Sequence, residues 1–369
     1  MSPSGKPTVL ATSRTPVELV ADRLWTAALG GDDHAAGDIV LQAVATGMAA
    51  ETVLLDVIGA VQRKVGEEWA ANRMTVAQEH AVTAISDRVV TAVSLAVDPP
   101  SGPPLARVTI ACVDGEWHAL PARLLAEVLR LRGFRVDYLG AQVSAPHLIA
   151  DLHRTGPDAV ALSSSIPTRL PAAHATITAC QAAGVPVIAG GAAFGPDGRY
   201  ARLLGADAWA PDARTAASLL ATTPLGPPRS AHQAVDDLPH LLDQEFTLIS
   251  RTSASLVKAM LAGLEAHLPE LSRYTELQMQ HTAEDLANIV DYLKTSVYVD
   301  DPELFAGFLH WTADVLVARG VPAGHLAPAL DVLGEQLKDF PRALATLLRA
   351  RASLARAFPP RDPDPESRP

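Results

Sequence analysis

The stretch RVTIACVDGEWHALPARLLAEVLRLRG, residues 107–133, decides how the central part of the chain folds. Its opening, RVTIACV, is a short and mainly apolar run, which is typical of a buried strand. The residues from 119 onward repeat apolar side chains at the spacing of a helix. A strand followed by a helix is the first half of a β-α-β unit, so this stretch predicts a parallel sheet.

Similar apolar runs recur downstream, separated by helix-like stretches. They lie at residues 134–140, 158–164, 185–191 and 206–212. Strands that alternate with helices predict a doubly wound, Rossmann-like parallel sheet, and we place this α/β domain at residues 106–222. Ligands of such sheets bind outside the carboxyl ends of the strands, near a topological switch point. We therefore expect the functional residues of this domain at its strand ends.

The residues on either side of this domain are predicted to be helical. Residues 14–98 carry apolar side chains at helical spacing with short connections, which predicts an antiparallel bundle. Residues 236–358 predict an all-α domain, in which Thr282 is expected to cap a helix. Proline-rich stretches at 98–106 and 222–233 separate the three predicted domains.

Composition restricts the class of protein. The chain has 369 residues, is 48% hydrophobic and carries a formal net charge of -11, which argues against binding to duplex DNA. It contains no charge-free apolar stretch of about 18 residues and no signal-peptide pattern, so we expect a soluble cytoplasmic protein without a membrane span. Cys112 and Cys180 lie in apolar contexts, which predicts buried thiols and neither a disulfide framework nor a zinc site.

The loop after the first predicted strand carries a histidine and a carboxylate. Glu116 and His118 are two residues apart, with Trp117 between them. Neutral imidazole is a common ligand of transition metals, and a carboxylate behind it orients the ring and raises its basicity. The alternative interpretation is an ordinary loop histidine beside a solvated acid.

Two other strand ends carry small or polar residues. The third strand ends in a run of serines that includes Ser163 and Ser165, and the fourth ends in Gly190 and Gly191. Serines there can hydrogen-bond a polar ligand, and glycines let the backbone approach a bulky ligand closely. Taken singly, the serines could cap the next helix and the glycines could form a turn. Together these strand ends predict a long groove.

In their order and spacing, these residues resemble the motif of cobalamin-binding domains, which reads Asp-x-His-x-x-Gly, then Ser-x-Leu, then Gly-Gly. The resemblance implies a cobalamin whose cobalt takes His118 as its lower axial ligand, with Glu116 as the partner of that histidine. It implies further that the displaced nucleotide base is contacted or enclosed by Ser163, Ser165, Gly190 and Gly191. The chain departs from the motif at Glu116, which replaces Asp, and at Pro121, which replaces Gly and stiffens the loop.

A second resemblance lies in the N-terminal helices. Trp69 is followed nine residues later by Glu79 and His80, which resembles the signature of the helical cap in CarH-type cobalamin photoreceptors. The resemblance implies adenosylcobalamin, with Trp69 packed on the adenosyl group and the Glu-His pair beside it. Ala70 stands where members that form a bis-histidine adduct after illumination carry a histidine. The alternative is a core tryptophan beside exposed helix residues.

The C-terminal helical block resembles the bilin-binding, globin-like and phycobiliprotein-like domain of photocobilins. The resemblance implies a bilin, and since the block contains no cysteine, the bilin must be non-covalent, with biliverdin the natural candidate. Residues with suitable aromatic, imidazole or cationic groups are Arg273, Tyr274, His281, Tyr292, Tyr298, His310 and Trp311. Each could instead be a core or surface residue. The block could also bind haem through His281 or His310, or could serve in dimerisation alone.

These resemblances predict a light-sensing signalling protein without catalytic residues. Light would cleave the cobalt–carbon bond, and the loss of packing against the cap would rearrange the domains. CarH-type regulators begin with a winged helix that this chain lacks, so we expect no nucleic-acid partner, but an unknown signalling protein and homo-oligomers. The alternatives are a corrinoid methyl carrier that serves a methyltransferase, and a non-catalytic interaction module whose cobalamin pocket has degenerated.

Overall fold

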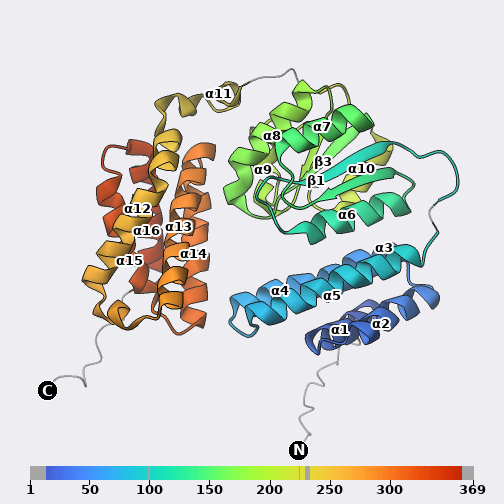
Figure 1. The fold of residues 1–369 in the computed structure, drawn as a ribbon, viewed down its shortest axis with the longest axis horizontal. Helices are drawn as coiled ribbons and strands as arrows, with labels where there is room; N and C mark the ends of the chain where they lie inside the picture. Colours follow the sequence, from blue (N-terminus) through green and yellow to red (C-terminus); the bar gives the residue numbers. More distant parts are fainter. Residues whose placement is uncertain (1–13, 99, 224, 229–232, 360–369) are drawn as a thin grey trace, which may run out of the picture. The chain divides into compact units, whose positions relative to one another are not determined.

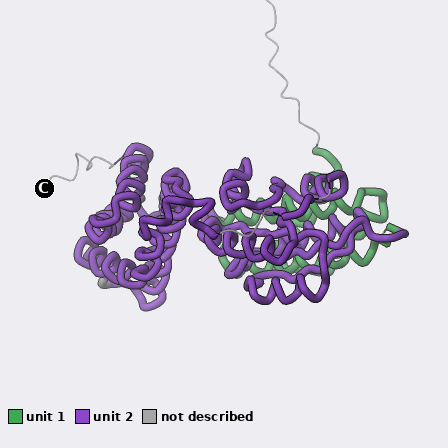
Figure 2. The backbone as a smooth tube through the Cα atoms, turned by 90° about the horizontal axis from the view of Figure 1, so that it is seen from above, with its two compact units in different colours: residues 1–69, 73–100 green, residues 70–72, 101–369 purple. Residues whose placement is uncertain are grey.

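The computed structural model describes residues 14–98, 100–223, 225–228 and 233–359. Two compact units make up the chain, Met1–Trp69 with Arg73–Pro100 and Ala70–Asn72 with Ser101–Pro369 (Figure 2). Among the described helices, none combines the length and the apolar character that crossing a membrane requires.

The N-terminal unit is helical, as predicted. Its elements are α1 (Pro16–Leu29), α2 (Asp33–Ala45), α3 (Ala50–Thr52), the π-helix η1 (Val53–Ile58), α4 (Gly59–Ala70) and α5 (Val76–Leu95). Thr15 and Thr75 begin α1 and α5 with capping boxes. In each box the threonine hydroxyl accepts the backbone N–H three residues on, and the side chain of that residue accepts the backbone N–H of the threonine. The π-turn was not predicted. It joins α3 to α4. Four of its six residues are buried, and they are Val53, Leu54, Val57 and Ile58.

The central α/β domain contains all five predicted strands, paired in parallel in the order β2-β1-β3-β4-β5. The strands are β1 (Arg107–Cys112), β2 (Arg135–Gly140), β3 (Ala159–Ser163), β4 (Val187–Gly190) and β5 (Ala208–Ala210). The helices between and after them are α6 (Ala119–Leu131), α7 (Ala145–Thr155), α8 (Leu170–Ala182), α9 (Arg199–Leu203) and α10 (Ala213–Thr222). Helices α7 and α8 cover one face of the sheet, and α6 and α10 cover the other (Figure 1).

The register of the sheet aligns the ends of its three central strands. Cys112 pairs with Ser163, and Ser163 pairs with Gly190. The loops that follow β1, β3 and β4 therefore leave the same edge side by side. The strand order changes direction at β1, since β2 lies on one side of it and β3 on the other. In this topology that point is where ligands bind.

The C-terminal part is all helical. It contains α11 (Ala234–Asp237), η4 (Pro239–Asp243), α12 (Glu245–His267), η5 (Pro269–Arg273), α13 (Glu276–Val299), α14 (Pro302–Ala318), η6 (Ala323–His325), α15 (Leu326–Gln336) and α16 (Pro341–Ala357). The expectation that Thr282 caps a helix is wrong. Thr275 begins α13 with a capping box to Gln278, while Thr282 lies about two turns inside and donates to the carbonyl of Gln278 at 2.9 Å.

The C-terminal helices and the α/β domain share part of one apolar core. Tyr298, Val299 and Leu304 are buried in the cluster that also holds residues of β3, β4 and α8. Polar contacts also link the C-terminal helices to the α/β domain. His174 on α8 is 1% exposed, with its Nδ1 2.9 Å from the Tyr298 hydroxyl and its Nε2 3.0 Å from Asp237.

Candidate cofactor-binding site

The loop between β1 and α6 places His118 and Glu116 together at the carboxyl edge of the sheet. The Glu116 carboxylate is fully buried. Its Oε1 lies 2.6 Å from His118 Nδ1 and also accepts the His118 backbone N–H at 2.9 Å. The imidazole itself remains partly open, with 35% of its side chain exposed. The predicted local carboxylate–imidazole pair is therefore present in the structure.

The second carboxylate oxygen of Glu116 faces the segment that follows β3. Oε2 accepts the backbone N–H groups of Ser165 at 2.7 Å and Ile166 at 3.0 Å, and the Ser164 hydroxyl at 3.2 Å. Burial alone would raise the pKa of Glu116, but hydrogen bonds from His118, Ile166 and Ser165 outweigh it and lower the pKa to about 2. Glu116 is therefore a carboxylate at neutral pH.

The ionised carboxylate settles the tautomer of His118. A carboxylate only accepts hydrogen bonds, so Nδ1 must carry the proton that lies between the two groups. In neutral imidazole the lone pair then belongs to Nε2. Nε2 has no hydrogen-bond partner or ion pair within the part of the chain that the structure describes. This arrangement suits coordination of a metal by Nε2, with the buried carboxylate fixing the ring.

The surroundings of His118 bear on the kind of metal it can bind. The described residues contain no group of three or more histidine, cysteine, aspartate or glutamate side chains that could hold a metal ion. A corrin supplies four ring nitrogens to its cobalt, so a corrinoid needs only one further ligand from the protein on this face. Trp117 is 51% exposed and stacks on the imidazole, with 3.8 Å between ring centroids. Cobalamin fits this single-histidine donor set.

Ser164 is a site residue that sequence reasoning missed. Its hydroxyl holds Glu116, whereas Ser165, which was predicted to contact the ligand, contributes its backbone N–H to the carboxylate. Ser163 is the last residue of β3 and is 7% exposed, and its carbonyl accepts the Val113 N–H at 3.0 Å. Three consecutive serines give no local signal of which one faces the carboxylate, because that depends on the packing of two loops.

Of the two glycines at the end of β4, Gly191 is required by the close packing of the backbone. Gly191 has φ +99°, and a Cβ at this position would lie 2.2 Å from the Ser164 carbonyl oxygen. Gly190 accepts the Ser164 N–H at 3.1 Å. Only glycine lets the two loops approach so closely. The pair thereby fixes the backbone of Ser164, and the predicted contact with a ligand remains a proposal.

Pro121 fits its place in the structure. It is the third residue of α6, which His118 precedes as the N-cap. The first turn of a helix has no intrahelical acceptors for its N–H groups, so a proline there costs no hydrogen bond. Pro121 is also exposed. The stiffening of the loop therefore does not prevent His118 from presenting Nε2.

The cap residues lie in the N-terminal unit, on two consecutive helices. Trp69 is near the end of α4 and is half-buried, as is Glu79 in the first turn of α5. His80 is exposed, and its Nδ1 contacts a carboxylate oxygen of Glu79. The other oxygen of Glu79 accepts the Thr83 hydroxyl at 2.9 Å. The roles proposed for these residues toward an upper ligand remain predictions.

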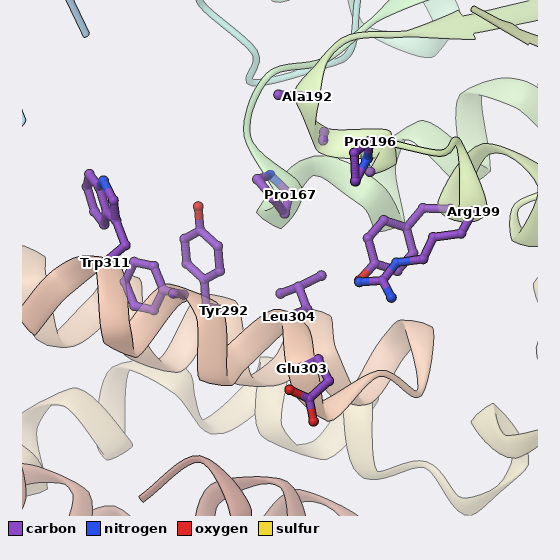
Figure 3. A pocket seen from close by; sticks show the side chains of 13 residues that line it. Pro167, Ala192, Pro196, Arg199, Tyr292, Glu303, Leu304 and Trp311 are labelled. Atoms are coloured by element: carbon purple, nitrogen blue, oxygen red, sulfur yellow. The ribbon is translucent and has the colours of Figure 1, made fainter. Parts of the chain in front are cut away.

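A pocket of about 430 Å³ lies between the α/β loops and the C-terminal helices, inside one compact unit (Figure 3). Of the seven predicted bilin-binding residues, the structure places Tyr292 and Trp311 in its lining. Tyr292 stacks on Phe308 with 3.7 Å between ring centroids, and Figure 3 shows its hydroxyl directed toward the loop of Pro167. The loops on the facing side contribute Pro167, Ala192 and Pro196, among others.

The other five residues predicted for the bilin do not line this pocket. Tyr298 is engaged with His174, and His310 bonds the Ser353 hydroxyl at 3.1 Å on the side of α16. The remaining three are exposed and precede Tyr292 along α13 or lie before that helix; they are Arg273, Tyr274 and His281. Helical periodicity does not show which face of a helix meets another domain, and the assignment of all seven residues to a bilin remains a prediction.

Comparison with known proteins identifies two domains of the chain. Residues 106–220 match the model of the B12 binding domain, and residues 20–94 match a second model, also described as a B12 binding domain. The chain carries a cobalamin-binding module. This confirms the prediction of cobalamin binding, and the structure confirms a helical N-terminal domain and a Rossmann-like domain.

One curated relative is the HTH-type transcriptional repressor CarH of Myxococcus xanthus. It is 36% identical over 138 residues, which cover 35% of this chain and 43% of the relative. The chain therefore spans less than half the length of that relative. The likeness supports the prediction of a CarH-like protein. It does not support the expectation that no nucleic acid is a partner, because the relative is named as a transcriptional repressor.

Three solved structures are similar at low sequence identity. The monomethylamine corrinoid protein of Methanosarcina barkeri has a TM-score of 0.46 at 18% identity, over 55% of this chain and 98% of its own. A cobalamin-binding protein from Desulfitobacterium hafniense DCB-2 has a TM-score of 0.30 at 21% identity, over 54% and 96%. The methanol:cobalamin methyltransferase complex of Methanosarcina barkeri has a TM-score of 0.31 at 15% identity, over 62% and 90%.

Several predictions remain untested by these comparisons. They are the bilin, the globin-like character of the C-terminal helices, the photolysis of a cobalt–carbon bond and the absence of enzymatic activity.

Proposed function

We propose that this protein is a light-sensing signalling protein that binds adenosylcobalamin with His118 as the lower axial ligand of cobalt. The observation that carries the proposal is the state of His118. Its Nδ1 is held by a buried carboxylate with a pKa of about 2, while its Nε2 has no partner within the described residues. A CarH-like relative and two B12 binding domain matches support it.

The bound cofactor would supply a cobalt–carbon bond that visible light cleaves. The chain's own residues position it. Glu116 fixes the ring of His118, and the Ser163 hydroxyl and the Gly190–Gly191 turn are proposed to meet the displaced base. In the cap, Trp69 offers an aromatic face, and Glu79 and His80 offer hydrogen-bonding groups for an adenosyl ligand. Losing that ligand would remove contacts of the cap, which is the proposed signal.

We propose further that the pocket beside Tyr292 takes a non-covalent bilin. Tyr292 and Phe308 form a stacked pair, and Trp311, 46% exposed, extends the aromatic surface. Aromatic faces of this kind suit a conjugated tetrapyrrole. The volume of about 430 Å³ lies in the range of small-molecule sites. This ligand would extend absorption to red light.

Absorption spectra test the first proposal. The full chain is incubated in the dark with adenosylcobalamin, freed of excess cofactor and recorded before and after illumination. We expect a base-off, histidine-bound spectrum that changes with light, and we expect His118→Ala to lack it. His153→Ala is the matched control, because His153 is an exposed residue in the last turn of α7. A His118→Ala spectrum equal to that of the wild type would contradict the axial role.

The same experiment separates the alternatives. A corrinoid methyl carrier would hold a methyl form and act only beside a methyltransferase. A degenerated module would retain no corrinoid at all. Biliverdin added in parallel tests the second chromophore, with Trp311→Ala expected to weaken its red band.

A further inference from the structure

Arg169 stands behind the loop that carries His118. It is the last residue of the short helix η2 (Pro167–Arg169), which directly follows the residues that hold Glu116. Its guanidinium lies flat against Gly115. A Cβ on Gly115 would be 3.0 Å from Nη1 and 3.1 Å from Cζ of Arg169, and Gly115 has φ +76°. The glycine thus makes room for the guanidinium under the β1–α6 loop.

Among the residues that the structure describes, none offers a hydrogen-bond acceptor to the guanidinium of Arg169. Its Nε is buried without a hydrogen-bond partner. Across the described residues, Arg169 forms neither an ion pair nor another hydrogen bond through its side chain. Glu116 follows Gly115, which the guanidinium contacts, but the oxygens of Glu116 are taken by His118, Ser164, Ser165 and Ile166. Arg169 as a whole is half-buried, but its Nε–H is shielded from solvent without an acceptor, and an incoming anion would satisfy that donor.

We propose that Arg169 is an oxyanion site, and that it binds the phosphodiester in the nucleotide loop of a bound cobalamin. The planar guanidinium fork matches two phosphate oxygens, and such charge-assisted bonds are the strong ones. This inference rests on the cobalamin binding described above.

The location of Arg169 favours the phosphodiester over other anions. It contacts Gly115 in the loop that carries His118, and it lies in the segment that follows β3, whose last residue Ser163 is proposed to meet the base. The phosphodiester joins the corrin to that base in any cobalamin. A carboxylate of a ligand in the pocket beside Tyr292 is the other source of an oxyanion. Arg169 is not among the residues that line that pocket, whereas Pro167 is.

A pair of corrinoids provides the test. Cobalamin carries the phosphodiester, and cobinamide lacks the phosphate, the ribose and the base. The full-length wild type and Arg169→Gln are titrated with each corrinoid, and dissociation constants are read from absorbance after equilibrium dialysis. We expect Arg169→Gln to weaken cobalamin about 10- to 100-fold and to leave cobinamide unchanged. Arg169→Lys should recover part of the loss, since it keeps the charge but not the fork.

Two controls make the outcome specific. Arg154→Gln alters an exposed arginine in the last turn of α7, away from the strand ends, and should leave both affinities unchanged. Circular dichroism verifies that each variant is folded. An Arg169→Gln variant that weakens both corrinoids equally, or neither, would overturn the phosphodiester assignment alone. A wild type that binds neither corrinoid would overturn this proposal together with the cofactor assignment.

Discussion

Replacing Glu116 by glutamine tests how His118 is held. The carboxylate accepts five hydrogen bonds, two from His118 and three from residues 164–166. Glutamine keeps one oxygen and turns the other into an amide that donates. Whichever way it is oriented, its NH₂ group faces N–H or O–H donors in a fully buried place.

The pKa gives the size of the effect. A carboxyl whose pKa is 4.5 in the unfolded chain and about 2 in the folded one contributes about 3 kcal/mol at neutral pH. Because the folded pKa is the lower one, this contribution is complete above pH 4.5 and is lost as the pH falls toward 2. Glu116→Gln should therefore be about 3 kcal/mol less stable at pH 7, and the difference from wild type should shrink in acid.

Urea unfolding of the full chain, followed by circular dichroism at several pH values between about 7 and 3, measures this difference. Asp114→Asn is the matched control, because Asp114 is an exposed carboxyl on the same loop. A Glu116→Gln variant within about 0.5 kcal/mol of wild type at pH 7 would refute the reasoning. So would a difference that stays constant as the pH is lowered.

Two further substitutions probe the supports of the site. Gly191→Ala should destabilise the α/β domain by about 3 kcal/mol, since its Cβ would lie 2.2 Å from the Ser164 carbonyl. Gly140→Ala is the control, because Gly140 also has a positive φ but a Cβ there would meet open space. Thermal unfolding of both variants separates the clash from backbone strain. An equal loss of stability in the two variants would show that the clash contributes nothing. Tyr298→Phe leaves His174 Nδ1 without its partner and should cost about 1–2 kcal/mol in urea unfolding. An unchanged midpoint would show that this hydrogen bond does not hold the C-terminal helices to α8.

Much of the fold follows from local sequence patterns. The five strands were predictable because each is a short apolar run bounded by glycine, proline or helix-like residues, and burial selects such runs. The Glu116–His118 pair was predictable because two residues on one loop meet without help from the rest of the chain. The start of α13 was misplaced because two threonines offered a cap, and the capping box of Thr275 with Gln278 prevailed over Thr282.

What could not be predicted depends on contacts between distant segments. Ser164 reaches Glu116 across 48 positions of sequence, and its neighbours in the serine run look the same locally. Arg169 gives no signal in a sequence, because only the packed loop shows that its Nε is buried without an acceptor. The pocket beside Tyr292 arises where α13 and α14 meet the α/β loops, and no periodicity encodes that meeting.

The short segment from Ser164 to Arg169 serves two neighbours at once. The backbone N–H groups of Ser165 and Ile166 donate to the Glu116 carboxylate, which holds the ring of His118. Pro167 forms part of the wall of the pocket beside Tyr292. A displacement of these six residues would therefore change the hydrogen bonds that hold Glu116 and the wall of the pocket together.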